Sequence, residues 1–456
     1  MGILLRGGTV VSSEGTETLD VLLDGERIAA VGKDLSAADA RVVDCKGKLL
    51  FPGFIDGHTH FDLEVCGTIT ADDFATGSRA ALRGGTTMVV DFAAPDKGET
   101  LSSGLKRWRE KAEGKSACDY GFHMTIDDWN KGISQEIGEM MEQGIPTFKM
   151  YMTYPAMMIP EGDMYHALLR LKEVGGVAGV HCENDGVIRA LIEQAKAEGK
   201  MGPGSHPRTR PAPLEAEAVG HLLRLAQLAE VPVMIVHLSA KESLEEVRSA
   251  RGRGQKVYVE TCPQYLLLED TVYDNPDYME AAKFVCAPPI RKKEDREALW
   301  EALKNGEIDT VATDHCSFTT AQKRAGRYDF TKIPGGLPSV EHRGALLYTA
   351  GVAGGRITAS DLCRVLSTNP AKLYGCWPRK GVIAPGSDGD IVVYDPEADG
   401  VITASDQAQN VDYTPYEGFQ TRGSIARVYL RGQLAVDGGK VQKTEGKFIY
   451  REKSQL

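Results

Sequence analysis

The chain has 456 residues, of which 42% are hydrophobic and 26% charged, and its formal net charge is −11. This acidic balance, without a local basic patch, argues against nucleic acid as a partner, because its phosphates would be repelled. No apolar run approaches the ~20 residues that a membrane span needs, and the first residues lack the charged and apolar regions of a signal peptide, so we expect a cytoplasmic protein with no membrane role.

Both ends of the chain show short alternating strands broken by glycine and polar turns. The pattern runs from Ile3 to Val43 and returns from Gly381, most clearly in residues 389–394 and 425–432. Two β-rich ends that flank one middle region most simply form one domain together. We therefore expect a small β-sandwich from residues 1–50 and 381–456, with a separate domain from residues 51–380.

The middle region alternates between strand-like and helix-like stretches. Apolar residues recur at helical spacing in residues 214–228, 242–250 and 298–304. Eight apolar runs are typical of buried strands: 49–55, 86–92, 120–124, 146–148, 177–180, 232–236, 256–261 and 308–313. The alternation predicts an α/β fold, a (β/α)8 TIM-like barrel, whose active site lies where the strands end. A doubly wound open sheet is the structural rival, but it would not bring distant strands to one point.

Residues that can bind a metal follow five of these runs. His58 and His60 share one face of their strand, because strand side chains alternate, and neutral imidazoles suit a divalent metal. The other candidates each end their own run: Lys149, His181, His237 and Asp314. A lone strand-end histidine is more often a hydrogen-bonded core residue, which is our expectation for His123, His166, His206, His221 and His342. Four imidazoles at one barrel mouth instead predict a metal site.

Three further side chains bear on this site. Asp314 is predicted as a metal ligand and general base, with a helix N-cap as the alternative. Lys149 is a candidate for carboxylation by carbon dioxide, which would let it bridge two metals, but its chemistry alone equally fits a substrate-binding or solvent-reaching lysine. We expect Asp56, Glu183 and Asn184 to hold the metal ligands in place without binding the metal themselves.

The nine cysteines are scattered singly, without a CxxC pair, which predicts reduced thiols and no zinc-thiolate site. Two of them, Cys182 and Cys316, are close in sequence to proposed ligands, but we do not expect either to bind metal.

In combination, these residues resemble the dihydropyrimidinase and hydantoinase branch of the amidohydrolase superfamily along nearly the whole chain. The matching segments are 51–60 (FPGFIDGHTH), 148–154 (FKMYMTY), 181–184 (HCEN), 236–239 (VHLS), 260–266 (ETCPQYL), 287–291 (APPIR) and 313–315 (TDH). The resemblance implies a binuclear zinc centre, for which Mn²⁺ or another divalent metal is an alternative. In that centre His58, His60 and Asp314 hold one metal, His181 and His237 hold the other, and carboxylated Lys149 bridges both.

The resemblance also implies where the substrate binds and how subunits associate. In that family the tyrosine at the position of Tyr154 hydrogen-bonds the substrate carbonyl, and backbone groups near Ala287 and Gly335 hold the amide edge of the ring. Ala287 stands where serine is common and Gly335 where asparagine is common, and a glycine there loosens its loop. A homotetramer is implied, with residues 446–451 as a candidate subunit contact.

The implied reaction is the opening of a cyclic amide, dihydrouracil or a 5-substituted hydantoin, to an N-carbamoyl amino acid by a metal-bridging hydroxide. Asp62 stands where the related dihydroorotases carry an arginine that binds a substrate carboxylate, so a neutral ring substituent is favoured. Apolar residues expected at the mouth fit an alkyl or aryl substituent, although they equally fit loop packing: Phe61, Leu63, Val65, Met152, Met157 and Met158. Allantoinase is the nearest alternative. A catalytically silent scaffold is a more remote one, because all six ligand positions are filled.

Overall fold

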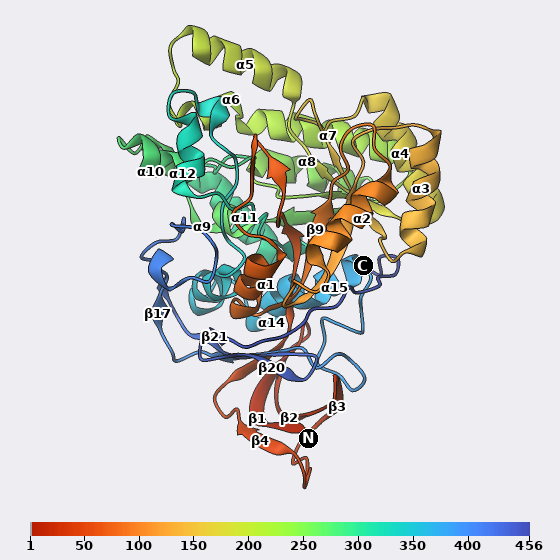
Figure 1. The fold of residues 1–456 in the computed structure, drawn as a ribbon, viewed down its shortest axis with the longest axis vertical. Coiled ribbons are helices and arrows are strands. Elements are labelled where there is room, and N and C mark those ends of the chain that lie inside the picture. Colours follow the sequence, from red (N-terminus) through yellow and green to blue (C-terminus); the bar gives the residue numbers. More distant parts are fainter. Residues whose placement is uncertain (1) are drawn as a thin grey trace.

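The computed structural model describes residues 2–456, which form a barrel above a large sheet (Figure 1). The barrel is a parallel sheet of eight strands in the order of the chain. Its strands are β6 (Phe54–Thr59), β9 (Thr86–Ala93), β10 (Asp119–Thr125), β11 (Thr147–Tyr151), β12 (Val177–His181), β13 (Val233–Ile235), β14 (Val257–Thr261) and β15 (Thr310–Val311). The predicted (β/α)8 barrel is confirmed.

The barrel closes through the segment that follows the short last strand. His315 pairs with Thr59 as an isolated parallel bridge. The His60 amide donates to the His315 carbonyl at 2.8 Å, and the His315 amide donates to the His58 carbonyl at 3.2 Å. The first and eighth strands are thereby joined at their C-terminal ends, which is where the predicted ligands lie.

Helices cover the outside of the barrel (Figure 1). The predicted helical stretches lie within α7 (Ala212–Ala229), α8 (Lys241–Gly252) and α11 (Lys293–Lys304), whose apolar faces are buried. The other covering helices are α1 (Phe74–Arg83), α2 (Leu101–Ala112), α3 (Lys131–Glu142), α4 (Glu161–Val174), α13 (Arg343–Leu347), α14 (Ala359–Cys363) and α15 (Asn369–Leu373). Two insertions, α5 (Asp185–Ala197) and α6 (Ser205–Thr209), lie at the end of the molecule opposite the large sheet (Figure 1). None of the helices in residues 2–456 has the length and apolar character to cross a membrane.

Strands from both chain ends form one nine-stranded sheet. The N-terminal strands are β1 (Ile3–Val11), β2 (Thr16–Asp24), β3 (Arg27–Gly32), β4 (Arg41–Asp44) and β5 (Leu49–Pro52), and the C-terminal ones are β16 (Ile391–Asp395), β19 (Ser424–Leu430), β20 (Gln433–Asp437) and β21 (Lys440–Val441). The two groups meet where β5 pairs antiparallel with β16. Buried side chains from both groups share one core cluster, so the two chain ends build one core together.

The apolar run at residues 49–55, predicted as one strand, is divided between the two sheets. β5 belongs to the nine-stranded sheet and β6 to the barrel, and Gly53 lies between them. A Cβ atom on Gly53 would lie 2.1 Å from the Thr87 hydroxyl, so only glycine permits the crossing at this point.

The C-terminal tail packs on the chain's own barrel. The Ile449 amide donates to the Tyr120 carbonyl at 2.8 Å. Arg451 is 1% exposed and donates to the Phe122 carbonyl and the Thr147 hydroxyl. Within the candidate subunit contact at residues 446–451, Ile449 and Arg451 are buried in the chain and Tyr450 is exposed, and the contact itself stays a prediction.

Candidate metal centre

The six predicted ligands line one pocket of about 410 Å³ at the C-terminal end of the barrel. They come from the ends of β6, β11, β12, β13 and β15. This placement follows from the parallel sheet, because every strand end reaches the same rim.

His58, His60 and Asp314 form the tightest group, since one ligand atom from each lies within 4.8 Å of the others. The Asp314 carboxylate oxygen is 3.1 Å from His60 Nε2 and 3.2 Å from His58 Nε2. His58 Nε2 is nevertheless buried without a hydrogen-bond partner in residues 2–456. An orphaned imidazole nitrogen beside a carboxylate fits a metal ligand.

His181 and His237 form the second group, with ring centroids 4.5 Å apart. His58 connects the two groups, because its ring centroid lies 5.3 Å from that of His237. His237 Nδ1 is also buried and finds no hydrogen-bond partner within the described chain. Burial lowers the pKa of all three imidazoles, which keeps them neutral and available for a metal.

Lys149 lies on β11 with 1% of its surface exposed. Its amino group lies over the rings of Phe92 at 5.1 Å and Tyr151 at 5.0 Å, and it forms no ion pair with any residue in 2–456. Burial lowers the pKa of Lys149 to about 8. A buried amine that is partly neutral near pH 7 is nucleophilic, as reaction with carbon dioxide requires.

Glu260, on β14, forms hydrogen bonds with the candidate ligands His58 and His237, a role that our sequence analysis missed. Its carboxylate accepts a hydrogen bond from His58 Nδ1 at 2.6 Å and one from the His237 amide at 3.1 Å. The first contact fixes the His58 ring so that Nε2 faces the pocket. Glu260 is 202 residues from His58 in the chain, so no local pattern links them.

Glu183 supports His181 in the same way, as expected. It accepts from His181 Nε2 at 2.7 Å and from Arg210 at 2.6 Å. Although burial opposes the shift, the Arg210 charge and the bond from His181 lower the pKa of Glu183 to about 2. Asn184, which we expected to act likewise, instead caps α5 by accepting from the Val187 amide and donates to Glu217.

Asp56 and the backbone around Asp314 fix the other side of the site. Asp56 accepts from the Thr313 amide at 3.1 Å and the Thr313 hydroxyl at 2.7 Å, which ties β6 to the end of β15. His237, Asp314 and Tyr154 have positive φ angles of 39°, 50° and 68°. Such angles are uncommon outside glycine and often mark functional positions, so the surrounding structure imposes them here.

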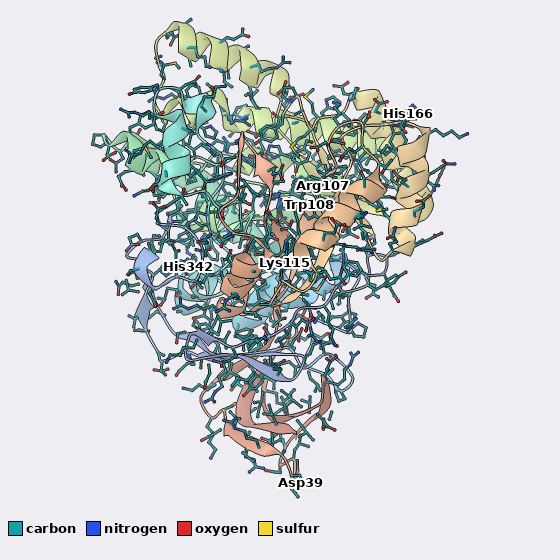
Figure 2. All side chains as sticks on the ribbon, in the orientation of Figure 1. Asp39, Arg107, Trp108, Lys115, His166 and His342 are labelled. Atoms are coloured by element: carbon teal, nitrogen blue, oxygen red, sulfur yellow. The ribbon has the colours of Figure 1, made fainter. Side chains whose placement is uncertain are left out.

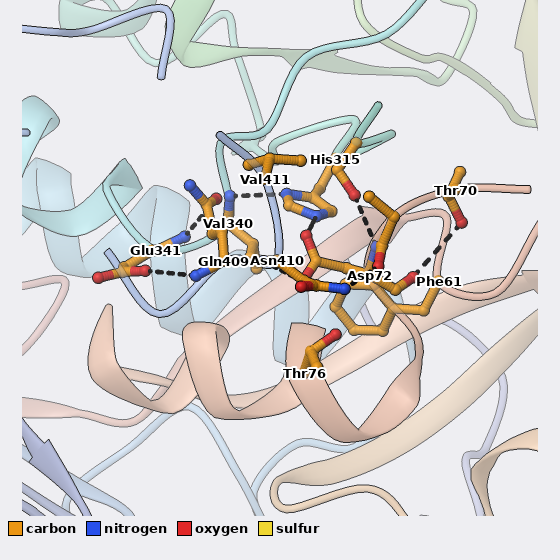
Figure 3. A network of polar contacts seen from close by, with 12 residues as sticks. Phe61, Thr70, Asp72, Thr76, His315, Val340, Glu341, Gln409, Asn410 and Val411 are labelled. Atoms are coloured by element: carbon orange, nitrogen blue, oxygen red, sulfur yellow. Dashed lines mark hydrogen bonds and ion pairs between the residues drawn. The ribbon is translucent and has the colours of Figure 1, made fainter. Parts of the chain in front are cut away.

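A polar network holds the segment after Asp314 (Figure 3). His315 Nδ1 accepts from the Ser339 and Val340 amides, so Nε2 carries the proton that it shares with Asp72 at 3.1 Å. Asp72 in turn accepts from the Asn410 amide at 2.8 Å. The network connects the metal rim to the C-terminal part of the chain. Asp72 is 243 residues from His315 and 338 residues from Asn410, which explains why spacing did not reveal these contacts.

The predicted substrate contacts share the pocket wall with the ligands. Tyr154, Ala287 and Gly335 all line it. The Tyr154 ring centroid is 5.2 Å from that of His181, and burial raises the pKa of its hydroxyl, which therefore stays protonated. Of the apolar residues expected at the mouth, the pocket includes Leu63, Val65 and Met157, joined by Ile192, Phe330 and Ile333; Phe61, Met152 and Met158 are not among its lining residues.

The remaining histidines lie apart from the ligand groups. His166 is exposed on α4, so our expectation of a core residue is wrong there, whereas His342 is buried near the C-terminal segment (Figure 2). His123 donates to the Gly57 carbonyl at 2.9 Å, and His206 donates to the Cys286 carbonyl at 2.7 Å in the pocket wall. All nine cysteines are free, and only Cys66 is exposed.

The chain is similar to known proteins along nearly its whole length. The sequence profile of the amidohydrolase family matches residues 49–435. The D-hydantoinase of Geobacillus stearothermophilus is 41% identical over 436 residues, 95% of this chain and 92% of that protein. The D-hydantoinase of Streptomyces coelicolor is 43% identical over 440 residues, 95% of this chain and 94% of that protein. The crystal structure of dihydropyrimidinase from Brevibacillus agri NCHU1002, 42% identical, covers 100% of this chain and 99% of its own, with a TM-score of 0.98.

Proposed function

This chain belongs to the amidohydrolase family, and we propose that it opens cyclic amides, dihydropyrimidines or 5-substituted hydantoins, to N-carbamoyl amino acids. The observation that carries the proposal is the convergence of four imidazoles, a lysine and an aspartate on one pocket that also presents Tyr154. The relatives named D-hydantoinase match this chain along almost its full length, which supports the same class of reaction.

The site uses divalent metal, and we propose two Zn²⁺ ions per chain. His58, His60 and Asp314 would hold one, His181 and His237 the other, and Lys149, carboxylated by carbon dioxide, would be shared. Support comes from the orphaned His58 Nε2 and His237 Nδ1 atoms and from the buried, unpaired amine of Lys149. Divalent metals held there would make a nucleophilic hydroxide available near neutral pH and would polarise the substrate carbonyl.

The chain's own residues then move protons and orient the ring. Asp314 accepts the remaining proton of the attacking hydroxide and delivers it to the leaving ring nitrogen. The Tyr154 hydroxyl donates a hydrogen bond to the carbonyl oxygen as negative charge develops there. Backbone groups of Ala287 and Gly335 hold the amide edge. The apolar wall formed by Leu63, Val65 and Met157 faces an uncharged substituent.

The test is hydrolysis of dihydrouracil, 5-phenylhydantoin and allantoin by the purified chain supplied with zinc and bicarbonate. Opening of either of the first two, lost in Lys149→Ala, is the expected result. Opening of allantoin alone would replace the proposal with the allantoinase alternative. No opening of any of the three would reject the proposal and favour a non-catalytic scaffold.

We also propose that the chain works in the cytoplasm as a homotetramer. The nine free cysteines fit a reducing compartment. Gel filtration with light scattering measures the assembly directly, and a monomeric mass would reject the tetramer.

A further inference from the structure

Lys323 is a fully buried lysine without a carboxylate partner. It lies in α12 (Thr320–Lys323) and has 0% of its surface exposed. Its ammonium donates to two backbone carbonyls, Val285 at 3.0 Å and Pro334 at 3.0 Å. Burying a charge is costly unless it is well bonded, so these two contacts explain why the side chain is tolerated there.

The two carbonyls belong to the two segments that line the substrate wall. Val285 precedes Ala287 by two residues, and Pro334 directly precedes Gly335. A second link joins the same segments, because the Gly336 amide donates to the Val285 carbonyl at 2.9 Å. Gly336 has φ 151°, and a Cβ atom there would lie 2.4 Å from the Cys316 carbonyl, so the loop packs closely against the Cys316 backbone at this point. One ammonium therefore bonds both segments.

We propose that Lys323 is a positioning residue that fixes the separation of the two backbone segments which hold the amide edge of the ring. Lys323 is absent from the pocket lining and acts only through those segments. The inference rests on the proposed function. It explains how a loop with glycine at position 335, which has no side chain to anchor it, keeps a defined position. Burial lowers the pKa of Lys323 to about 8, so most of the ammonium survives at neutral pH.

The test is Lys323→Met, which keeps the length of the side chain and removes the donors. We expect KM to rise roughly 10- to 100-fold, the worth of a charge-assisted hydrogen bond, with little change in kcat per bound zinc. KM should rise equally for dihydrouracil and 5-phenylhydantoin, because both present the same amide edge. The exposed Lys332, in the same loop, provides the matched control Lys332→Met, which should leave KM unchanged.

Hydrogen exchange without substrate gives a second measurement that does not depend on turnover. In Lys323→Met the amides of residues 285–287 and 334–336 should exchange faster than in the parent, and Lys323→Arg, which keeps the charge, should restore part of their protection. A lower melting temperature with unchanged KM and unchanged exchange in these segments would show a merely structural lysine and overturn the proposal. A KM increase confined to 5-phenylhydantoin would overturn it as well.

The exchange experiment also separates this inference from the proposed function. If the parent opens no ring, the proposed function fails, and exchange in the two segments still decides whether Lys323 joins them. If Lys323→Met does not fold, the shorter Lys323→Gln replaces it in both measurements. Fast exchange of the Gly336 amide in the parent would contradict its hydrogen bond to the Val285 carbonyl, on which the proposal depends.

Discussion

Glu260 offers the sharpest test of how the metal centre is supported. Glu260→Leu removes the carboxylate that accepts from His58 Nδ1 at 2.6 Å, a contact in which both side chains are 1% exposed. The His58 ring would lose the partner that aims Nε2 at the pocket. Its Nδ1 proton would be left buried and unpaired.

The magnitude follows from that one contact. Burial raises the pKa of Glu260 to about 8, so the magnitude is taken from the buried donor that is left without a partner, which costs about 1–3 kcal/mol, and each ~1.4 kcal/mol is a factor of about 10 in an equilibrium constant. We therefore expect zinc to bind roughly 10- to 100-fold more weakly, in line with the usual effect of removing a partner behind a metal ligand. Zinc affinity would be measured by competition with a chromophoric chelator at fixed pH.

Glu260→Gln is the matched control, because its amide oxygen still accepts a hydrogen bond from His58 and the side chain cannot ionise. It should retain most of the zinc affinity. If Glu260→Leu bound zinc as tightly as the parent, the orientation of His58 would not depend on Glu260 and the reasoning would be refuted. If the two variants lost affinity equally, the charge rather than the orienting contact would be responsible.

Three further outcomes are expected. Tyr154→Phe should lower kcat about 10²- to 10³-fold with little change in KM, because the ring keeps its place beside His181 while the donor to the oxyanion is lost; unchanged turnover would remove Tyr154 from the mechanism. Lys149→Ala should lower the zinc content, measured by mass spectrometry of the metal, as well as abolish ring opening, and full zinc content would rule out a shared lysine ligand. Burial lowers the pKa of His206 to about 3 from its ordinary 6.5, so below pH 6.5 the unfolded chain binds more protons than the folded chain. The free energy of unfolding should therefore fall by about 2 kcal/mol at pH 5 from this group alone. Denaturant unfolding at pH 7.5 and pH 5 should show a smaller loss in His206→Gln, which can still donate to the Cys286 carbonyl, and an equal loss would contradict this assignment.

The convergence of the six candidate ligands on one pocket was predictable, because they follow five apolar runs of the chain. In a parallel barrel that local pattern is sufficient, since all strand ends meet at one rim. The local pattern could not predict that Gly53 divides the run at residues 49–55 between two sheets. The hydrophobicity does not break there, and the glycine is required only because the backbone passes close to Thr87.

The supporting residues were not predictable from spacing. Glu260 and Asp72 are buried polar groups whose partners lie 202 and 243 residues away in the chain, and the two carbonyls that Lys323 bonds lie in separate loops, 38 and 11 residues away. A single sequence shows only that such residues are present; the fold decides which of them meet. Asn184 illustrates the reverse error. Its proximity to His181 in sequence suggested a role at the site, but its side chain caps α5 instead.

The seating of Arg451 in the barrel has a consequence for how the chain folds. Its side chain donates to the Phe122 carbonyl and the Thr147 hydroxyl, which lie 329 and 304 residues earlier in the sequence. Contacts of such large sequence separation form slowly, because the entropy of loop closure is lost before they are made. β5 likewise pairs with β16, which follows the whole barrel in the sequence. We therefore expect both sheets to be completed late in folding, and partly built barrels to expose apolar surface until then.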